Sequence, residues 1–268
     1  MALQIVRAES VQSAAGILAA EAGARFLGGG TLVVRAHNSG DLSIDKLVLA
    51  DGLGLDAVSV ASGRAEIGAA VTMAKVAEHP ELGFLAPVAQ EIGGPAVRAM
   101  ATVGGNLFAP SPYGDFSVAL LALDAGLSVE DGKGAKTLAL AEFLAARDSQ
   151  KGIVRSVAFA VPPAGSFRFV KVMRRHPHGA SVLSIAAVLP LADGKVKGAR
   201  VAYGAMAPTA IGAGAVEQAL EGRALDDAAI EAAVGVAREG TSPATDPFAS
   251  AWYRANVLPV HLARLLQG

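Results

Sequence analysis

The sequence predicts an α+β chain of two domains, residues 1–165 and 166–268. Three observations support this class. Short strand and helix patterns alternate with turns through the first 165 residues. The run Pro162-Pro163-Ala164-Gly165 is the clearest domain boundary in the chain. After it, strand patterns come first and helix patterns follow within about 100 residues, which is typical of a small α+β domain.

The first domain is expected to contain short elements separated by glycine and proline turns. The predicted helices cover 11–22, 72–76, 88–92 and 116–123, and the predicted strands cover 25–27, 47–50, 58–60, 65–69 and 153–161. Thr72 is a candidate N-cap, and Pro80 ends the helix that follows it. Residues 100–115 have the densest run of Gly, Pro, Asn and Ser, so the whole segment is predicted to be loop.

The second domain is expected to be simpler. Its predicted strands cover 167–173, 182–189 and 196–203, and its predicted helices cover 213–220, 226–238 and 251–266. Asp193-Gly194 is a two-residue hairpin signal between the last two strands.

Composition excludes several classes of function. The net charge of −1, from 23 basic and 24 acidic residues, does not favour a nucleic-acid surface. The chain has no cysteine, which excludes disulfides, iron–sulfur ligation and a thiol nucleophile within it. The five histidines show no metal-site spacing, so we expect no metal centre.

The distribution of apolar residues indicates the cellular compartment of the protein. No apolar run approaches the roughly 18 residues of a membrane span. The first seven residues lack the pattern of a secretory signal. We therefore expect a cytoplasmic protein with no membrane span.

Two glycine-rich loops are the best candidates for a ligand site: residues 27–31 (LGGGT) and 101–106 (ATVGGN). Consecutive glycines let the backbone approach a ligand closely, and successive N–H groups then form a concavity that suits phosphate oxygens. Thr31 and Thr102 each add a hydroxyl group, and Asn106 adds an amide. Two such loops fit a two-sided clamp around a diphosphate.

Each loop also has an ordinary structural interpretation. Either alone is consistent with a tight turn between elements. Neither contains G-x-G-x-x-G, and G-x-x-x-x-G-K-[ST] occurs nowhere in the chain, so a Rossmann dinucleotide site and a P-loop are not expected.

The two loops resemble those of a known family. Residues 26–33 (FLGGGTLV) are similar to the first FAD loop of the flavin-carrying medium subunit in the xanthine dehydrogenase and carbon monoxide dehydrogenase family. Residues 101–115 (ATVGGNLFAPSPYGD) resemble its second loop. Residues 169–175 (FVKVMRR) and 201–209 (VAYGAMAPT) resemble segments of its C-terminal domain, so the likeness extends over essentially the whole chain.

The resemblance implies a fold and a set of site residues. The fold is a two-subdomain FAD-binding domain of the PCMH type, followed by a small α+β domain like the C-terminal domain of the CO dehydrogenase flavoprotein. The implied cofactor-binding residues are Arg25, Phe26, Leu27, Gly28, Gly29, Gly30, Thr31, Thr102, Gly104, Gly105, Asn106, Asp115 and Lys171.

The family pattern assigns different parts of FAD to these residues. The glycine loops bind the diphosphate, and Arg25 and Phe26 lie beside the adenine. Asp115 hydrogen-bonds hydroxyl groups on the flavin side, and Lys171 lies near the isoalloxazine ring. A helix cap remains an alternative for Asp115, and a solvated or subunit-facing charge remains one for Lys171.

The sequence also departs from the family pattern. An aspartate usually follows the Arg-Arg pair by a few residues, whereas residues 176–181 here read HPHGAS. The residue that packs against the flavin ring is not identifiable from the sequence. The ring-edge contact, and with it the electron acceptor, therefore stays open.

The resemblance implies a function without any catalytic residue in this chain. FAD passes electrons from iron–sulfur clusters of a small partner subunit to NAD⁺, oxygen or a quinone. The absence of Cys from the chain and of His from both loops predicts that the FAD is held noncovalently. A large partner subunit with molybdopterin oxidises an aldehyde or N-heterocycle, and the expected assembly is a dimer of heterotrimers. The alternatives are a stand-alone flavin oxidoreductase and a non-catalytic nucleotide-binding module.

Overall fold

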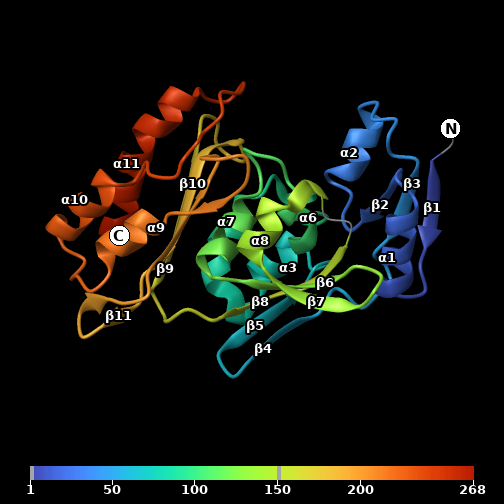
Figure 1. Cartoon of the computed structure of the whole chain (residues 1–268), viewed down its shortest axis with the longest axis horizontal. Coiled ribbons are helices and arrows are strands. Elements are labelled where there is room, and N and C mark those ends of the chain that lie inside the picture. The colour runs from blue at the N-terminus through green and yellow to red at the C-terminus, as the bar shows by residue number, and fades with distance from the viewer. Residues whose placement is uncertain (1–2, 150–151) are drawn as a thin grey trace. The chain divides into compact units, whose positions relative to one another are not determined.

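The structure is a computed structural model that describes residues 3–149 and 152–268. Contacts within the chain divide it into two compact units. The first comprises Met1–Ala109 and Ala125–Ala160, and the second comprises Pro110–Asp124 and Val161–Gly268. Figure 1 labels many of the elements of both units.

The first unit begins with a small parallel sheet of order β1-β3-β2. The strands are β1 (Gln4–Arg7), β2 (Ala24–Leu27) and β3 (Lys46–Leu49). The helix α1 (Val11–Ala20) joins the first two strands, and the hydroxyl of Ser10 caps it by accepting a hydrogen bond from the amide of Ser13 at 3.0 Å. A helix that the sequence did not predict, α2 (Val33–Asn38), follows β2 directly.

The second part of the first unit is a five-stranded antiparallel sheet of order β4-β5-β8-β6-β7. Its strands are β4 (Val58–Ala61), β5 (Arg64–Gly68), β6 (Gly126–Glu130), β7 (Ala135–Ala139) and β8 (Ile153–Ala160). The helical segments are α3 (Met73–Glu78), η1 (Pro80–Leu85), α4 (Ala86–Gln90), α5 (Pro95–Arg98), α6 (Val103–Leu107), α8 (Leu140–Ala145) and η2 (Arg147–Ser149). Thr72 caps α3, as the sequence predicts.

The prediction that residues 100–115 are entirely loop is wrong. The segment contains α6, and Thr102 is its N-cap, whose side chain accepts a hydrogen bond from the amide of Gly105. Glycine and asparagine have low intrinsic helix propensity, so tertiary contacts rather than local preference stabilise this helix.

The second unit is built on an antiparallel sheet of order β14-β13-β10-β9. Its strands are β9 (Phe167–Met173), β10 (Ser181–Val188), β13 (Arg200–Gly204) and β14 (Ile211–Gly212), with a separate hairpin of β11 (Leu191–Ala192) and β12 (Lys195–Val196). The helices are α7 (Asp115–Ala122), α9 (Gly214–Leu220), α10 (Asp227–Gly235) and α11 (Ala251–Gln267).

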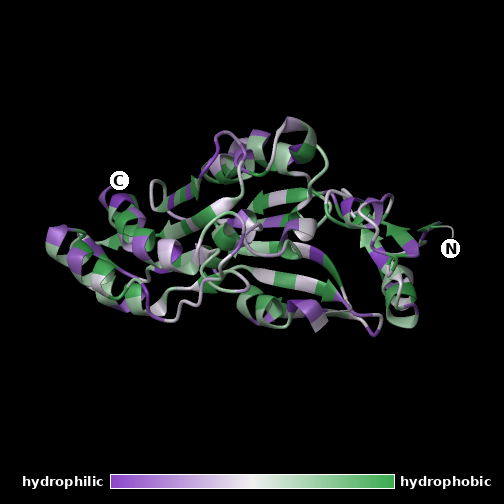
Figure 2. Cartoon of the chain, turned by 90° about the horizontal axis from the view of Figure 1, so that it is seen from above, coloured by the Kyte–Doolittle hydropathy of each residue, from purple (hydrophilic) through white to green (hydrophobic). Residues whose placement is uncertain are grey.

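Helices cover both faces of this sheet, which explains why all eight residues of β10 are buried. Leu183 and Ile185 pack in a core cluster with residues of α9, α10 and α11. Ser184 lies on the opposite face, where it meets Gly204 beside Val118 of α7. In Figure 2 the C-terminal helices alternate between hydrophobic and hydrophilic residues, as expected where one helix face is buried.

Two details of the second unit refine the sequence prediction. The strand expected at 196–203 is interrupted after β12, at Gly198 with φ of 72°. The hairpin prediction is confirmed, because Asp193 and Gly194, with φ of 52° and 74°, join Ala192 to its partner Lys195.

The segment Pro110–Asp124 belongs to the second unit because α7 packs against β10 and β13. A division of the chain into continuous domains at residue 165 therefore stays a prediction.

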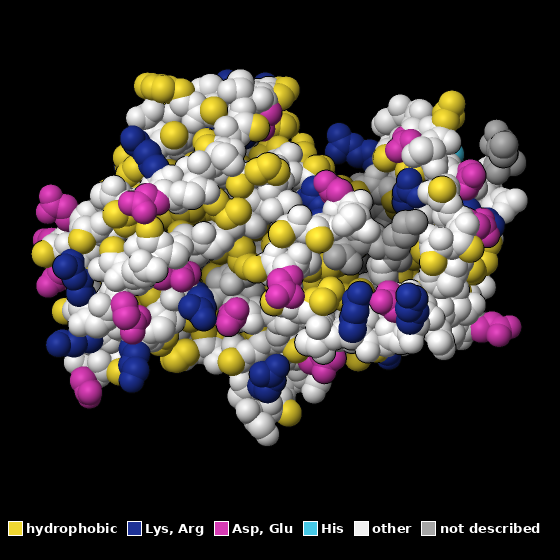
Figure 3. All heavy atoms as spheres, in the orientation of Figure 1, with side chains coloured by type: hydrophobic (Ala, Val, Ile, Leu, Met, Phe, Trp, Pro, Cys, Tyr) yellow, Lys and Arg dark blue, Asp and Glu magenta, His cyan; other side chains and the backbone are white. Residues whose placement is uncertain are grey.

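The surface carries charges of both signs. On the face drawn in Figure 3, Lys and Arg side chains lie interspersed with Asp and Glu side chains. None of the helices in the described part of the chain has the length and apolar character that a membrane span requires.

Candidate functional site

The first unit contains a cavity of about 550 Å³. The cavity wall includes the end of β2, the first glycine loop, the start of α6, η2 and the start of β8. The volume falls within the range of roughly 300–1,000 Å³ that is usual for small-molecule sites. Every segment that forms the wall belongs to the same compact unit.

The first glycine loop supplies the unpaired hydrogen-bond donors of this cavity. Among the described residues, no backbone N–H group from Gly28 to Leu32 donates a hydrogen bond to another protein group. Gly29, Gly30 and Thr31 are half-buried, whereas Gly28 and Leu32 are exposed. An amide without a protein acceptor needs a ligand or water as its partner. Five successive amides of this kind fit the anion-binding concavity expected from the sequence.

The two glycine loops lie against each other. A Cβ atom at Gly29 would come within 1.4 Å of the carbonyl oxygen of Met100, so only glycine fits there. Gly30 adopts φ of 74°, which starts the turn into α2. The three glycines of the first loop therefore have a packing role as well as a place in the cavity wall.

The second loop differs from the sequence prediction, because its amides are already paired within the protein. The amide of Val103 donates to the carbonyl of Val71 at 2.9 Å, and the amide of Gly104 donates to the carbonyl of Ala69 at 2.8 Å. The amide of Gly105 donates to Thr102 Oγ1 at 3.1 Å. The prediction that both loops offer free amides to the diphosphate is therefore wrong for the second loop. The amides of Val103 and Gly104 anchor α6 to the chain around Ala69, and the amide of Gly105 is bound to the N-cap.

Gly104 is required by this anchoring. A Cβ atom there would lie 2.8 Å from the Cβ of Ala69 and 3.0 Å from its carbonyl oxygen. At Gly105 a Cβ atom would meet only Thr102 Oγ1, at 3.0 Å, and this residue lines the cavity. The second loop thus contributes the backbone of Gly104 and Gly105 and the hydroxyl of Thr102 to the cavity wall.

Most of the predicted site residues come together here. Those that line the cavity are Arg25, Phe26, Gly28, Gly29, Gly30, Thr31, Thr102, Gly104 and Gly105. Leu27 and Asn106 do not line it. Asn106 is buried, with 8% of its surface exposed, and its amide donates to the carbonyl of Thr102.

Two arginines bring positive charge to the cavity. Arg25 Nη1 donates to the carbonyls of Ala22 and Ala24 at 2.7 and 2.9 Å. Arg147 Nη1 donates to the carbonyl of Ala109 at 2.9 Å, and its Nε pairs with Asp148 at 2.9 Å. Each guanidinium has five N–H donors and retains others for a ligand.

Four residues that the sequence did not predict also line the cavity: Phe108, Arg147, Ile153 and Val154. Phe108 packs edge-on against Phe143, with ring centroids 5.5 Å apart. Phe108 directly follows the second loop, which was an available signal. Nothing local in the sequence marks the other three residues, because the fold alone brings η2 and the start of β8 to the loops.

Asp115 and Lys171 belong to the second unit, where they form a buried ion pair of 3.0 Å. The alternative that Asp115 caps α7 is wrong, because the N-cap is Gly114 and no side-chain cap bond is formed. The alternative of a solvated Lys171 is also wrong, since only 5% of its side chain is exposed. Contact of either residue with a flavin stays a prediction.

The lining of the cavity suits an anionic ligand with a planar apolar part. The first-loop amides, which have no acceptor in the part of the chain that the structure describes, and the two guanidinium groups suit phosphate oxygens. Phe26, Phe108, Ile153 and Val154 supply apolar surface for a ring. Among the described residues, no group of three or more His, Cys, Asp or Glu is placed to hold a metal ion.

Comparison with known families supports this interpretation. Residues 1–162 match the model of the FAD binding domain in molybdopterin dehydrogenase. Residues 168–268 match that of the CO dehydrogenase flavoprotein C-terminal domain.

Individual relatives extend over most of the chain. The carbon monoxide dehydrogenase medium chain of Afipia carboxidovorans is 27% identical over 75% of this chain and 73% of its own length. The xanthine dehydrogenase FAD-binding subunit of Escherichia coli O157:H7 is 27% identical over 94% of this chain and 90% of its own.

Solved structures show the same fold. A chain of the reconstituted CO dehydrogenase from Oligotropha carboxidovorans matches with a TM-score of 0.91 at 24% identity, covering 100% of this chain and 97% of that one. The sequence resemblance and the fold class inferred from it are thus confirmed. The chain belongs to the family of FAD-binding flavoproteins of molybdopterin-dependent dehydrogenases.

Proposed function

We propose that this chain is the electron-transfer subunit of a heteromeric molybdenum hydroxylase and holds FAD noncovalently in the cavity of the first unit. The observation that carries the proposal is the row of amides from Gly28 to Leu32, which line the cavity and have no protein acceptor among the described residues. Bound FAD supplies the redox chemistry, and the protein supplies orientation, charge and access.

The residues of the cavity have separate tasks in this proposal. The first-loop amides hold the diphosphate, and Thr102 with Gly105 forms the surface on its other side. Arg25 and Arg147 offset the phosphate charge. Apolar residues of the cavity wall exclude water from the adenine. Leu27 and Asn106 support the loops from behind rather than touching the cofactor.

The flavin side of the cofactor is assigned to Asp115 and Lys171. This assignment comes from the family pattern, and the two charges are buried and paired with each other.

Noncovalent attachment is proposed because the described cavity wall contains no Cys, His or Tyr. Acid precipitation tests this directly. We expect the flavin to be released into the supernatant, and flavin that stays with the pellet would contradict the proposal.

The relatives are described as a medium chain and as an FAD-binding subunit. We therefore infer that this chain assembles with a large molybdopterin subunit and a small subunit that carries [2Fe–2S] clusters, as a dimer of heterotrimers. Electrons enter from the clusters and leave to NAD⁺, oxygen or a quinone. The organic substrate is an aldehyde or an N-heterocycle, and a cytoplasmic location stays a prediction.

Native purification tests the assembly. We expect flavin, molybdenum and iron to co-elute with this chain in one peak on size exclusion. A yellow protein that elutes alone and oxidises a substrate would favour a stand-alone flavin oxidoreductase. A colourless protein that binds nucleotides would favour a non-catalytic binding module.

A further inference from the structure

The ion pair between Asp115 and Lys171 is buried within the second unit. Lys171 Nζ lies 3.0 Å from Asp115 Oδ2, and the two side chains are 5% and 6% exposed. Burying two charges costs free energy unless their geometry is well fixed and their remaining hydrogen-bond donors and acceptors have partners. The groups that fix this pair are therefore informative about its role.

Ser181 fixes the carboxylate from the other side. Its Oγ donates a hydrogen bond of 2.7 Å to Asp115 Oδ1, while Lys171 occupies Oδ2. Ser181 itself is only 1% exposed. A short hydroxyl–carboxylate bond of this kind is among the stronger hydrogen bonds in proteins, so it restrains the rotation of the Asp115 carboxylate.

A β-bulge aims the Ser181 hydroxyl at Asp115. Along β9 and β10 the register passes from Ser181 opposite Met173 to Leu183 opposite Val172, which leaves Val182 as an extra residue. In a regular strand, residues two apart face the same side. Here Leu183 packs in the cluster with α11, whereas Ser181 faces Asp115 of α7.

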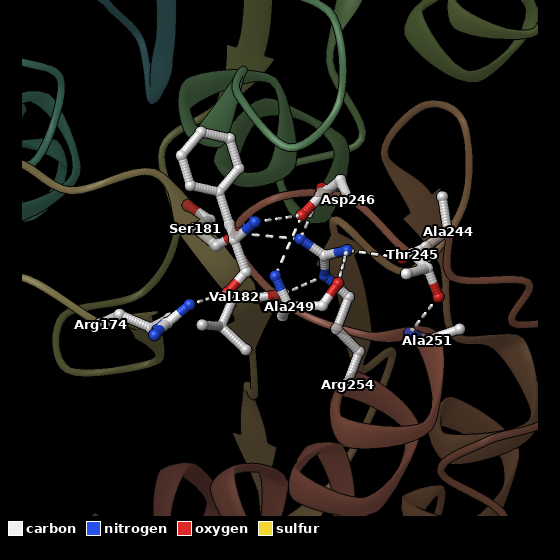
Figure 4. Close-up of polar contacts among 10 residues, drawn as sticks. Arg174, Ser181, Val182, Ala244, Thr245, Asp246, Ala249, Ala251 and Arg254 are labelled. Atoms are coloured by element: carbon white, nitrogen blue, oxygen red, sulfur yellow. Dashed lines mark hydrogen bonds and ion pairs between the residues drawn. The ribbon is translucent and has the colours of Figure 1, made fainter.

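Arg254 of α11 holds the bulge in place, as Figure 4 shows. Its Nε donates to the carbonyl of Val182 at 2.7 Å, and its Nη2 donates to the carbonyl of Ser181 at 3.4 Å. Nη2 also pairs with Asp246 at 2.8 Å. Arg254 is 1% exposed, so the bulge carbonyls are fixed by a buried guanidinium whose charge is itself paired.

We propose that Ser181 is a positioning residue that sets the geometry of the Asp115–Lys171 pair and, through this pair, the environment of the flavin. The proposal rests on the function proposed above, in which both residues face the cofactor. Ser181 lies in the segment 176–181, where the chain departs from the family pattern.

Ser184 provides a matched control on the same strand. Its side chain is fully buried, and its Oγ has no hydrogen-bond partner among the described residues. Ser184 stands opposite Lys171 in the pairing of β9 with β10, but its Oγ bonds to neither member of the ion pair. Ser184→Ala therefore removes a buried hydroxyl beside Lys171 without removing a hydrogen bond to the pair.

The test compares Ser181→Ala and Ser184→Ala in the full chain. The first readout is acetylation of the Lys171 amine by dilute acetic anhydride, followed by mass spectrometry. The second is the flavin absorption spectrum and the Kd for FAD. In Ser181→Ala we expect at least fivefold faster labelling, a shifted spectrum and FAD binding weaker by about five- to tenfold. In Ser184→Ala all three should stay within twofold of the wild type.

Two results would overturn the proposal. One is equal labelling of Lys171 in the two variants. The other is faster labelling in Ser181→Ala while its FAD affinity and spectrum match those of Ser184→Ala. A wild-type chain that binds no flavin would instead refute the proposed function, and the labelling rates would still decide whether Ser181 holds the pair.

Discussion

At the scale of single residues, neighbouring glycines in one short motif have different tasks. Gly104 permits the backbone of α6 to lie against Ala69, because any side chain there would clash with it. A Cβ atom at Gly105 would contact only the Thr102 hydroxyl, and Gly105 lines the cavity. The sequence predicted that both glycines serve the ligand, and only the three-dimensional contacts separate the two roles.

Substitution of the two glycines should separate folding from binding. Gly105→Ala adds a methyl group toward the cavity and improves helix propensity, so we expect unchanged or slightly higher stability and at least tenfold weaker FAD binding. Gly104→Ala should instead lower the free energy of unfolding by about 1–3 kcal/mol, because a close-packed contact is disrupted. Urea unfolding and fluorescence titration with FAD measure the two effects. Equal FAD affinity in Gly105→Ala and the wild type would contradict this account.

Asp246 should make stability depend on pH. Burial raises the pKa of this carboxyl, but hydrogen bonds from Arg254 and from the amides of Ala249 and Phe248 outweigh burial and hold the pKa below its ordinary value of 3.8. A carboxyl whose pKa is depressed in the folded state stabilises the fold above the unfolded pKa and loses this effect as the pH falls through the folded value. We therefore expect the contribution of Asp246 to be complete above about pH 5 and to decline below 3.8.

Urea unfolding of the wild type and Asp246→Asn between pH 2.5 and 6 measures this dependence. The variant should be less stable at pH 6, and the difference should shrink toward pH 2.5. A constant difference across this range would show that Asp246 does not titrate with folding.

At the scale of elements, the long helix α11 contains an internal proline. Pro259 has no N–H group, so the carbonyl of Ala255 loses its usual partner four residues on. Arg238, which follows α10, replaces that donor, because its Nε donates to the Ala255 carbonyl at 2.8 Å. A second bond joins Arg238 Nη2 to the Asn256 side chain at 3.2 Å. A residue of the turn after α10 thus lets α11 continue through the proline.

A double-mutant cycle tests this compensation. Arg238→Ala should lower the free energy of unfolding by about 1–2 kcal/mol in the wild type, since it leaves a carbonyl unpaired. In a Pro259→Ala background the helix supplies its own donor, so the same substitution should cost roughly 1 kcal/mol less. Additive effects of the two substitutions would rule out the compensation.

The elements also show which parts of the fold were predictable from the sequence. The prediction for β9 matches the observed Phe167–Met173, because a short run rich in aromatic and β-branched residues is typical of a strand in a sheet that is covered on both faces. The helix α6 was missed because its stability comes from Thr102 and from carbonyls about 30 residues earlier, at Ala69 and Val71. Arg147 was missed for a similar reason, since its partner Ala109 is 38 residues away.

At the scale of the molecule, the family resemblance gave the fold and the cofactor, whereas the division of labour at the site required the structure. The amides of the first loop have no protein acceptor among the described residues, whereas the amides at the start of α6 in the second loop are paired within the protein. Asp115 and Lys171 are paired in the second unit rather than placed in the cavity wall of the first. None of these distinctions follows from the spacing of glycines in a sequence.

Ligand binding should raise the stability of the FAD-binding unit. FAD at 100 times its Kd stabilises the native state by about 2.7 kcal/mol, which for a unit of this size raises the unfolding midpoint by roughly 5–11 °C. Riboflavin lacks the phosphates that the first-loop amides bind, so the same concentration should produce a much smaller rise. Differential scanning fluorimetry with both ligands measures this, and equal shifts would argue against a phosphate site.

The central claim is that the amides from Gly28 to Leu32 bind the diphosphate of FAD. A crystal structure of the FAD complex tests it most directly. We expect diphosphate oxygens within roughly 2.7–3.2 Å of several of these amide nitrogens. Diphosphate oxygens bound elsewhere, with these amides facing water, would contradict the account.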